Sequence, residues 1–377
     1  MYIDRRRRKR RSPLVMIVGL ILLVGAAYAI NQQASLIELR NPLVPPEPTS
    51  TPTRSALSYL ADAESLYANG QIVEASEAYA AVVALEPGND EALRWQAKLE
   101  ALRGHPSKAV VLAQKAVDLN PQNAQNLAVL SMAQDWNKQY DDALQTALEA
   151  LDNDPNLAEA YAYLAEIYID KGIWALALES AQTAVKLDEK SIEGWRNLGY
   201  VLDQQGRRDE ALTAYQKAID LHPKLGYLYV GKGWVYLALS DYEKALAEFQ
   251  RAVNVNPKSA DGYDALGWGH ILAGAPDRAV ISLEKALLVD PEYAPAYGHL
   301  AVAYYLRRNY EKAVEYFERA IALNQATTEY YYELGLSYLY KEPEDCQNAV
   351  PWLRKALDIN PESPQARQGL DYCARKK

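Results

Sequence analysis

The residues that could do chemistry are few and scattered along the 377-residue sequence. Gly231-Lys232-Gly233 and Gly267-Trp268-Gly269 look like fragments of nucleotide-binding loops, but they fall within expected helices, where small residues let a paired helix approach. No serine or cysteine stands beside a histidine in a nucleophile motif. No spacing that would gather metal ligands connects the four histidines, which are His105, His222, His270 and His299. We therefore expect no catalytic residue, no metal, no cofactor and no enzymatic activity.

A fixed period of 34 residues organises most of the chain. A first series of alanines recurs at this period, with a final step of 36, at Ala75, Ala109, Ala143, Ala177, Ala211, Ala245, Ala279, Ala313 and Ala349. A second series lies seven residues after the first and begins at Ala116. Prolines from Pro87 to Pro361 mark most of the unit ends. Two small residues on one helical face, followed by a closing proline, predict two short helices per unit that pack closely against their neighbours.

This pattern resembles the tetratricopeptide repeat family, and one unit meets it most fully, with Trp195, Leu198, Gly199, Ala211, Tyr215, Ala218 and Pro223. The first two units depart from the pattern, because Asp62 and Gln96 stand where the family has leucine. The resemblance implies an all-α fold, a right-handed α-solenoid of helix-turn-helix units ending in a capping helix at 364–377. About nine units are expected within 56–363, at 56–89, 90–123, 124–157, 158–191, 192–225, 226–259, 260–293, 294–327 and 328–363.

The residues before the first unit have a different character. A basic tail at 1–11 precedes a charge-free stretch at 12–37, in which residues 14–30 form an apolar run. This run is just long enough to cross a bilayer as a helix. We expect a single-pass transmembrane helix whose basic side stays in the cytoplasm, so that the repeats lie on the extracytoplasmic side of a cell membrane. The alternative is a cleaved signal peptide, because Ala27-Tyr28-Ala29 resembles a cleavage site.

A linker and the distribution of charge complete this picture. Residues 38–55 are rich in proline and threonine and favour an extended spacer between the membrane and the repeats. The whole chain has a net charge of −9, but residues 1–11 carry +6, so the remainder carries −15. Nucleic-acid binding depends on clustered Lys and Arg. We therefore expect no nucleic-acid partner for the acidic repeats.

The family resemblance also implies which residues line the inner, concave side of the solenoid. In units one to five these positions are mainly acidic, with Glu64, Glu91, Glu159, Glu166, Glu193 and Asp203 beside Arg94, Lys98 and Arg196. In units five to nine they are mainly aromatic and aliphatic, with Tyr200, Tyr227, Trp234, Leu237, Trp268, Ile271, Tyr305, Tyr332 and Leu339. We interpret this second set as a ligand groove in which Tyr200, Trp234 and Trp268 form a ladder, because contiguous exposed apolar surface marks binding sites. The alternative is that these rings only pack against the next helix.

The two cysteines fall near the C-terminal end of the array. Cys346 lies in the lengthened turn of the last unit, and Cys373 lies in the expected capping helix. In a stacked array these two segments should be close, and an even cysteine count in an exported protein favours a disulfide. We predict a Cys346–Cys373 disulfide.

Two functions are compatible with this sequence. The first is a membrane-anchored scaffold of a bacterial envelope that binds protein or peptide segments in its groove to help assemble an envelope complex. The second is carbohydrate binding during polysaccharide export, with Trp234 and Trp268 as stacking faces beside Asp261 and Asp264. Neither the identity of the partner nor the oligomeric state follows from the sequence.

Overall fold

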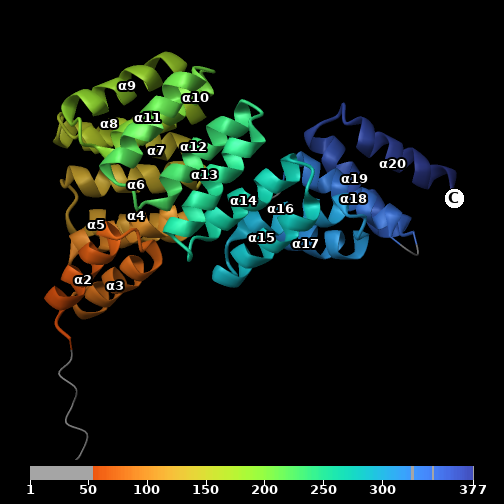
Figure 1. Cartoon of the computed structure of the whole chain (residues 1–377), viewed down its shortest axis with the longest axis horizontal. Coiled ribbons are helices and arrows are strands. Elements are labelled where there is room, and N and C mark those ends of the chain that lie inside the picture. Colours follow the sequence, from red (N-terminus) through yellow and green to blue (C-terminus); the bar gives the residue numbers. More distant parts are fainter. Residues whose placement is uncertain (1–53, 324–326, 342–343, 377) are drawn as a thin grey trace, which may run out of the picture. The chain divides into compact units, whose positions relative to one another are not determined.

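The computed structural model describes residues 54–323, 327–341 and 344–376, which form nineteen helices and no strand (Figure 1). Each first helix packs against the second helix of its pair, and pairs that are adjacent in sequence stack on one another. The nine pairs are α2 (Ala56–Ala68) and α3 (Ile72–Leu85), α4 (Asp90–Leu102) and α5 (Pro106–Leu119), α6 (Ala124–Trp136) and α7 (Tyr140–Asn153), α8 (Ala158–Asp170) and α9 (Trp174–Leu187), α10 (Ile192–Gln204) and α11 (Arg208–Leu221), α12 (Gly226–Ala238) and α13 (Tyr242–Val255), α14 (Ala260–Leu272) and α15 (Pro276–Val289), α16 (Ala294–Leu306) and α17 (Tyr310–Ala322), and α18 (Thr328–Tyr340) and α19 (Cys346–Ile359). Helix α20 (Pro364–Arg375) packs on the ninth pair, so the predicted all-α array with a terminal helix is confirmed.

A left-handed residue ends the first helix in eight of the nine pairs. Glycine occupies five of these positions, with φ between 73° and 86°, at Gly70, Gly104, Gly172, Gly206 and Gly274. Lys138, Ser240 and Arg308 occupy the other three, with φ between 59° and 63°. Glycine adopts this conformation without a steric penalty and is favoured where a helix ends. The eight positions follow the period of 34 residues, a signal that the sequence analysis did not use.

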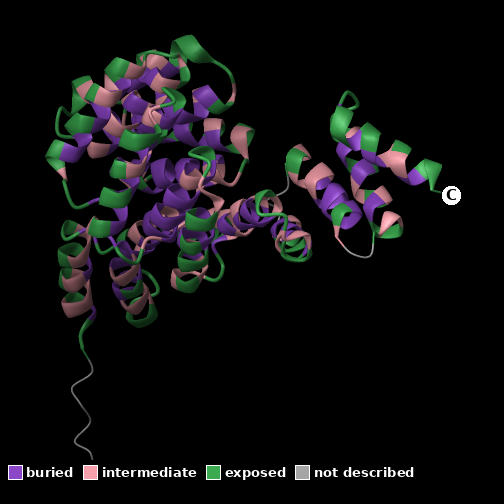
Figure 2. Cartoon of the chain, turned by 45° about the vertical axis from the view of Figure 1, so that its right-hand side comes forward, coloured by how far each residue is buried: buried purple, intermediate pink, exposed green. Residues whose placement is uncertain are grey.

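Small residues allow close packing within each pair. All nine alanines of the first series are fully buried. Glycines in several first helices face a large side chain of the second helix: a Cβ atom on Gly233 would lie 2.4 Å from Phe249, and one on Gly267 would lie 2.5 Å from Leu283. The two glycine-rich fragments are therefore packing positions, as expected. Buried residues gather where helices face one another, and exposed residues lie on the outer turns (Figure 2).

The first two pairs also contact turns that lie far along the chain, and we call this contact the seam. Tyr79 and Val82 of α3 share a hydrophobic cluster with Ile219 and Leu228. Three polar contacts cross the seam, between Lys224 Nζ and Asn69 Oδ1 at 2.8 Å, Lys258 Nζ and Glu74 Oε1 at 2.7 Å, and His105 Nε2 and Asp290 Oδ2 at 3.0 Å. Contacts between successive first helices show that these helices line the inner side of the array. The seam therefore encloses the inner side of the helices from α4 to α12.

Two features concern the ends of the chain. Cys346 at the start of α19 and Cys373 in α20 form a disulfide, with Cα atoms 5.6 Å apart. In the described ranges, no helix has both the length and the apolar character needed to cross a membrane. The predicted basic tail at 1–11, the transmembrane helix at 12–37 and nearly all of the linker at 38–55 lie outside the described residues.

Candidate functional site

A cavity of about 270 Å³ lies on the inner side of the array, in the part of the superhelix whose two ends meet at the seam. We call it the aromatic cavity, because its lining includes the six rings of Trp136, Tyr200, Tyr215, Tyr227, Trp234 and Tyr293. Its charged lining residues are Glu166, Arg196 and Asp261. Trp234 keeps 37% of its surface exposed. Three of the nine residues predicted for the groove, Tyr200, Tyr227 and Trp234, therefore meet at one site.

Two glycines make room for the rings around this cavity. A Cβ atom on Gly231 of α12 would lie 2.4 Å from the ring of Tyr215. A Cβ atom on Gly104, whose φ is +86°, would lie 2.5 Å from the ring of Tyr293 across the seam. A larger residue at either position would displace a ring, so both glycines help to shape the aromatic cavity.

The other six predicted groove residues do not line the aromatic cavity. Leu237, Ile271 and Leu339 are buried in a large hydrophobic cluster, with 9%, 8% and 5% of their surfaces exposed. Trp268 is half-buried, and its ring centroid lies 4.5 Å from that of His299. Tyr305 and Tyr332 are half-buried against the same cluster. The ladder expected from Tyr200, Trp234 and Trp268 therefore places only its first two members at this cavity.

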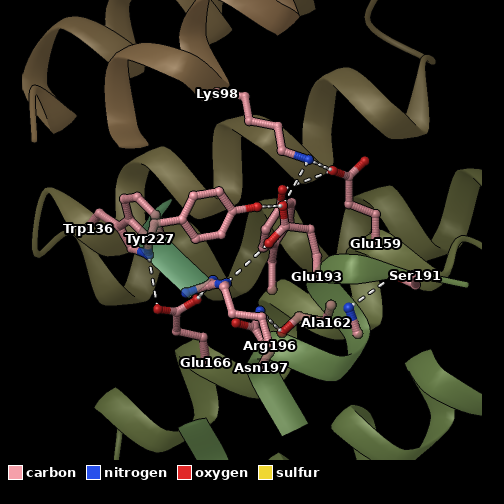
Figure 3. Close-up of polar contacts among 12 residues, drawn as sticks. Lys98, Trp136, Glu159, Ala162, Glu166, Ser191, Glu193, Arg196, Asn197 and Tyr227 are labelled. Atoms are coloured by element: carbon pink, nitrogen blue, oxygen red, sulfur yellow. Dashed lines mark hydrogen bonds and ion pairs between the residues drawn. The ribbon is translucent and has the colours of Figure 1, made fainter. Parts of the chain in front are cut away.

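A network of mostly buried charged side chains lies on the inner side of the array (Figure 3). Lys98 Nζ lies 2.7 Å from Glu159 Oε1 and 3.3 Å from Glu193 Oε1. Arg196 bridges Glu193 and Glu166, with Nε 3.1 Å from Glu193 Oε2 and Nη2 2.6 Å from Glu166 Oε2. The network connects helices α4, α8 and α10, and two aromatic side chains join it: Tyr227 donates to Glu193 at 3.2 Å and Trp136 Nε1 donates to Glu166 at 3.1 Å.

The pKa values of this network follow from burial and from pairing. Burial opposes ionisation of Glu193, but Lys98 and Arg196 outweigh it and lower the pKa of this carboxyl. Burial also opposes ionisation of Lys98, yet Glu159 and the other neighbours raise the pKa of this ammonium group well above its usual value. The expectation that the acidic residues of units one to five form an open surface is therefore wrong for Glu159, Glu166 and Glu193. Their side chains are mostly buried and hold the helices together.

Some carboxylates on the inner side lack a cationic partner. Asp261 accepts a hydrogen bond from the Tyr293 hydroxyl at 3.2 Å, and burial raises the pKa of Asp261 to about 6. Asp135 is 2% exposed, and its Oδ1 atom has no hydrogen-bond partner in the described part of the chain. Burial, with the nearby charges of Glu166 and Asp170, raises the pKa of Asp135. Folding therefore favours the neutral form of Asp135, whereas Asp261 is a carboxyl that no cation of the described residues pairs with.

Replacing Asp135 with asparagine is expected to stabilise the protein at pH 7.5, by about 1–3 kcal/mol. Folding raises the pKa of this carboxyl. Above the pKa of the unfolded chain, the unfolded state releases the proton while the folded state keeps it, so the folded state becomes less stable as the pH rises. The gain should therefore be smaller at pH 4 than at pH 7.5. Urea unfolding of the wild type and the variant at both pH values measures it. Asp152→Asn on the exposed side of α7 is the control, and an equal gain there would contradict this explanation.

The seam contains a histidine whose ionisation links two distant parts of the array. His105 Nε2 lies 3.0 Å from Asp290 Oδ2, and His105 Nδ1 lies 2.9 Å from Glu100 Oε2. The interactions with Asp290 and with Glu100 raise the pKa of His105 to about 9. Beside this contact lies a second cavity of about 340 Å³, lined by Ile72, Val73, Leu102, Arg103, Tyr227, Asn256, Lys258, Ser259, Ala260, Asp261, Val289 and Asp290.

The seam is therefore expected to weaken as the pH rises from 6.5 to about 9. A histidine whose pKa is raised by folding stabilises the fold fully below its unfolded value and loses this contribution above its folded value. Hydrogen exchange of α3 and α12 should become faster across this range. In His105→Gln the exchange should be fast already at pH 6.5, after correction for the intrinsic pH dependence of exchange. An unchanged wild-type profile in the variant would show that His105 does not hold the seam.

The histidines and acidic residues form no other recognisable chemical centre. Within the ranges that the structure covers, no group of three or more His, Cys, Asp and Glu side chains could hold a metal ion. His299 Nδ1 pairs with Asp264 at 2.7 Å, whereas His270 takes no part in this pair.

Comparison with protein families gives a clear match. A tetratricopeptide repeat model matches residues 60–124, 137–192 and 196–265, and a second tetratricopeptide repeat model matches residues 294–326. Together these matches cover more than half of the chain. No curated protein sequence matches the chain at a significant level.

Several solved structures have similar folds. The chain is 18% identical to a chain in the Cut9–Hcn1 hetero-tetramer of the APC/C, with a TM-score of 0.60 over 80% of this chain and 59% of that chain. A tetratricopeptide repeat protein from Parabacteroides merdae is 18% identical with a TM-score of 0.45, over 66% of this chain and 98% of that one. A thermophilic tetratricopeptide repeat protein from Thermus thermophilus is 25% identical with a TM-score of 0.44, over 48% of this chain and 98% of that one. The present chain thus spans a little more than half of the Cut9–Hcn1 chain that it matches.

Proposed function

Because this chain belongs to the tetratricopeptide repeat family, we propose that it is a scaffold that binds a protein or peptide segment on the inner side of its helix pairs. In this proposal the chain is not an enzyme and uses no cofactor. The aromatic cavity is the main anchoring point for the bound segment, and Tyr200, Tyr227 and Trp234 contact it directly.

The observation that carries this proposal is the convergence of six aromatic side chains on one cavity. Tyrosine and tryptophan are the residues that most often supply the energy of protein interfaces. Here they come from helices α6, α10, α11 and α12 and from the residue before α16, so they approach the cavity from several sides. The partly exposed Trp234 leaves its ring available to a partner.

We further propose that the scaffold is anchored in a cell membrane, in a bacterial envelope, by residues 14–30. The N-terminus would be cytoplasmic and the repeats extracytoplasmic, where they would help to assemble an envelope complex. The apolar run and the basic block before it support this topology. The Cys346–Cys373 disulfide supports it as well, because disulfides persist in oxidising compartments. Protease added to intact spheroplasts should digest the repeats, and their survival would contradict the topology.

The carbohydrate-binding alternative has less support from the geometry. It needs Trp268 and Asp264 free to stack on a sugar and to accept its hydroxyls. Asp264 instead pairs with His299, and the ring of Trp268 lies against the same histidine. Only Trp234 and Asp261 remain in the arrangement that this function requires. We therefore favour a protein ligand and treat carbohydrate as an outcome of the test.

The test is site-specific photo-cross-linking in cells. A benzoylphenylalanine residue at position 234 should form cross-links to a partner protein. The matched control places the same group at Ile281 on α15, which is 68% exposed and does not line the aromatic cavity. Equal cross-linking from both positions, or none from position 234, would contradict the proposal. Cross-links from position 234 to glycan alone would favour the carbohydrate function.

A further inference from the structure

We infer that the aromatic cavity receives one cationic side chain, lysine or arginine, of the bound segment, and that Asp261 is its counter-ion. The inference rests on the proposed function and adds the chemical class of the residue that is recognised. It depends on three observations. The cavity has an aromatic lining, the carboxylate of Asp261 has no cationic partner, and the other charged side chains near the cavity already form ion pairs within the protein.

The aromatic lining suits a cation. The face of an aromatic ring carries partial negative charge and attracts ammonium and guanidinium groups within about 6 Å of its centroid. The structure already contains one such contact at this site, since the guanidinium carbon of Arg196 lies 5.5 Å from the centroid of the Trp136 ring. In the described part of the chain, no lysine or arginine lies over the rings of Tyr200, Tyr227 or Trp234, so these faces remain for a ligand.

The other charged residues of the cavity are satisfied within the protein. Glu166 accepts hydrogen bonds from Trp136 Nε1 at 3.1 Å and from Arg196 Nη2 at 2.6 Å. Arg196 is held in turn between Glu166 and Glu193. In the network of Figure 3, two cations, Lys98 and Arg196, face three carboxylates, so the network has no positive charge to spare.

Asp261 is different, because it is unpaired. Its only side-chain hydrogen bond comes from the Tyr293 hydroxyl at 3.2 Å, and no lysine, arginine or histidine of the described ranges forms an ion pair with it. Asp261 lines both the aromatic cavity and the second cavity at the seam. The cations of the second cavity are used elsewhere: Arg103 pairs with Glu100 at 2.8 Å, and Lys258 pairs with Glu74 at 2.7 Å.

These features exclude the other classes of side chain. An apolar side chain in the cavity would remove water from Asp261 without giving it a partner, which is costly for a carboxylate. An acidic side chain would be repelled. A lysine or arginine side chain can place its aliphatic stem against the rings and its charged end beside Asp261. The cavity therefore combines an apolar wall with one negative charge, which is the arrangement that such a side chain needs.

The experiment selects ligands from a random twelve-residue peptide library displayed on phage, with the full chain held in detergent micelles. Four proteins are compared: the wild type, Asp261→Asn, the surface control Asp152→Asn and Trp234→Ala. Asparagine preserves the shape of the aspartate side chain and removes its charge. We expect the wild type and Asp152→Asn to select peptides with a shared lysine or arginine, and Asp261→Asn to lose this preference. Selection on Trp234→Ala shows whether the peptides bind at the aromatic cavity.

A second measurement uses the wild type alone and so does not depend on how a variant folds. Replacing the shared basic residue of one selected peptide with norleucine should weaken binding by about tenfold, a typical size for a partly desolvated cation–aromatic contact. Lysine and arginine versions of the peptide show which cation is preferred.

The outcomes separate the two proposals. Peptides that need Trp234 but show no basic residue would overturn the inference and leave the scaffold function standing. A basic preference that persists in Asp261→Asn would also overturn it, because the acidic surface in general would then be responsible. If no peptide depends on Trp234, the scaffold function at this cavity fails, and the inference fails with it.

Discussion

Replacing Arg196 with methionine is expected to destabilise the array by about 3–5 kcal/mol, because it leaves the buried carboxylate of Glu166 without a cation and that of Glu193 with Lys98 alone. Arg196 lies between Glu166 and Glu193, and all three side chains are mostly buried. Repeat arrays unfold in steps, since each unit contacts only its neighbours. Hydrogen exchange of α8 and α10 is therefore the direct measurement, and protection there should fall most.

Two controls show whether the unpaired charge is the cause. Arg207→Met removes an exposed arginine just before α11 that pairs with Glu210, and such a solvent-screened surface pair contributes little to stability. Combining Arg196→Met with Glu166→Gln and Glu193→Gln removes the stranded charges together with the cation. This triple variant should recover much of the lost protection. If it is as unstable as Arg196→Met alone, the loss comes from packing of the arginine stem.

Removing the disulfide with Cys346→Ser and Cys373→Ser is expected to destabilise the C-terminal end of the array by about 3 kcal/mol, since the bond closes a loop of 27 residues. Within the described residues, α20 packs against α19 and, less extensively, against α18. The effect should therefore stay local. Hydrogen exchange in α19 and α20 should accelerate while the helices from α2 to α13 keep their protection.

The disulfide prediction has a chemical counterpart that needs no mutation. Adding a reductant to the wild type should reproduce the exchange pattern of the double variant, and adding it to the double variant should change nothing. Faster exchange throughout the array would show that the bond has a global role. Unchanged exchange in α20 would show that packing of Cys373 and its neighbours, and not the bond, holds the last helix.

The candidate site was only partly visible in the sequence. The inner positions implied by the family pattern included Tyr200, Tyr227 and Trp234, which do meet at the aromatic cavity. The same pattern gave no reason to add Tyr293 to them, because this residue is the last one of the unit 260–293 and precedes helix α16, outside the inner positions of the first helices. Tyr215 belongs to a core position of its own pair, where it packs against Gly199 and Gly231. Its contribution to the cavity follows only from that packing.

The acidic residues are a second case in which the sequence did not reveal the arrangement of the side chains. Glu159, Glu166 and Glu193 occupy inner positions, and by sequence alone such positions read as an exposed surface. In the structure they pair with Lys98 and Arg196, which come from first helices in other units. A pairing between units depends on how neighbouring first helices are placed in space. The spacing of residues along the chain does not contain this information.

The sequence by itself determined the array of helix pairs, the final helix and the close packing of small residues. These features follow from local spacing, because each unit repeats the same contacts with its neighbours. Only the tertiary structure decided that the first two pairs meet the turns after α11, α13 and α15. That meeting results from small rotations that add up over many units, and no single unit encodes their sum. For this reason the seam, the enclosed charges and the aromatic cavity appear only in the folded chain.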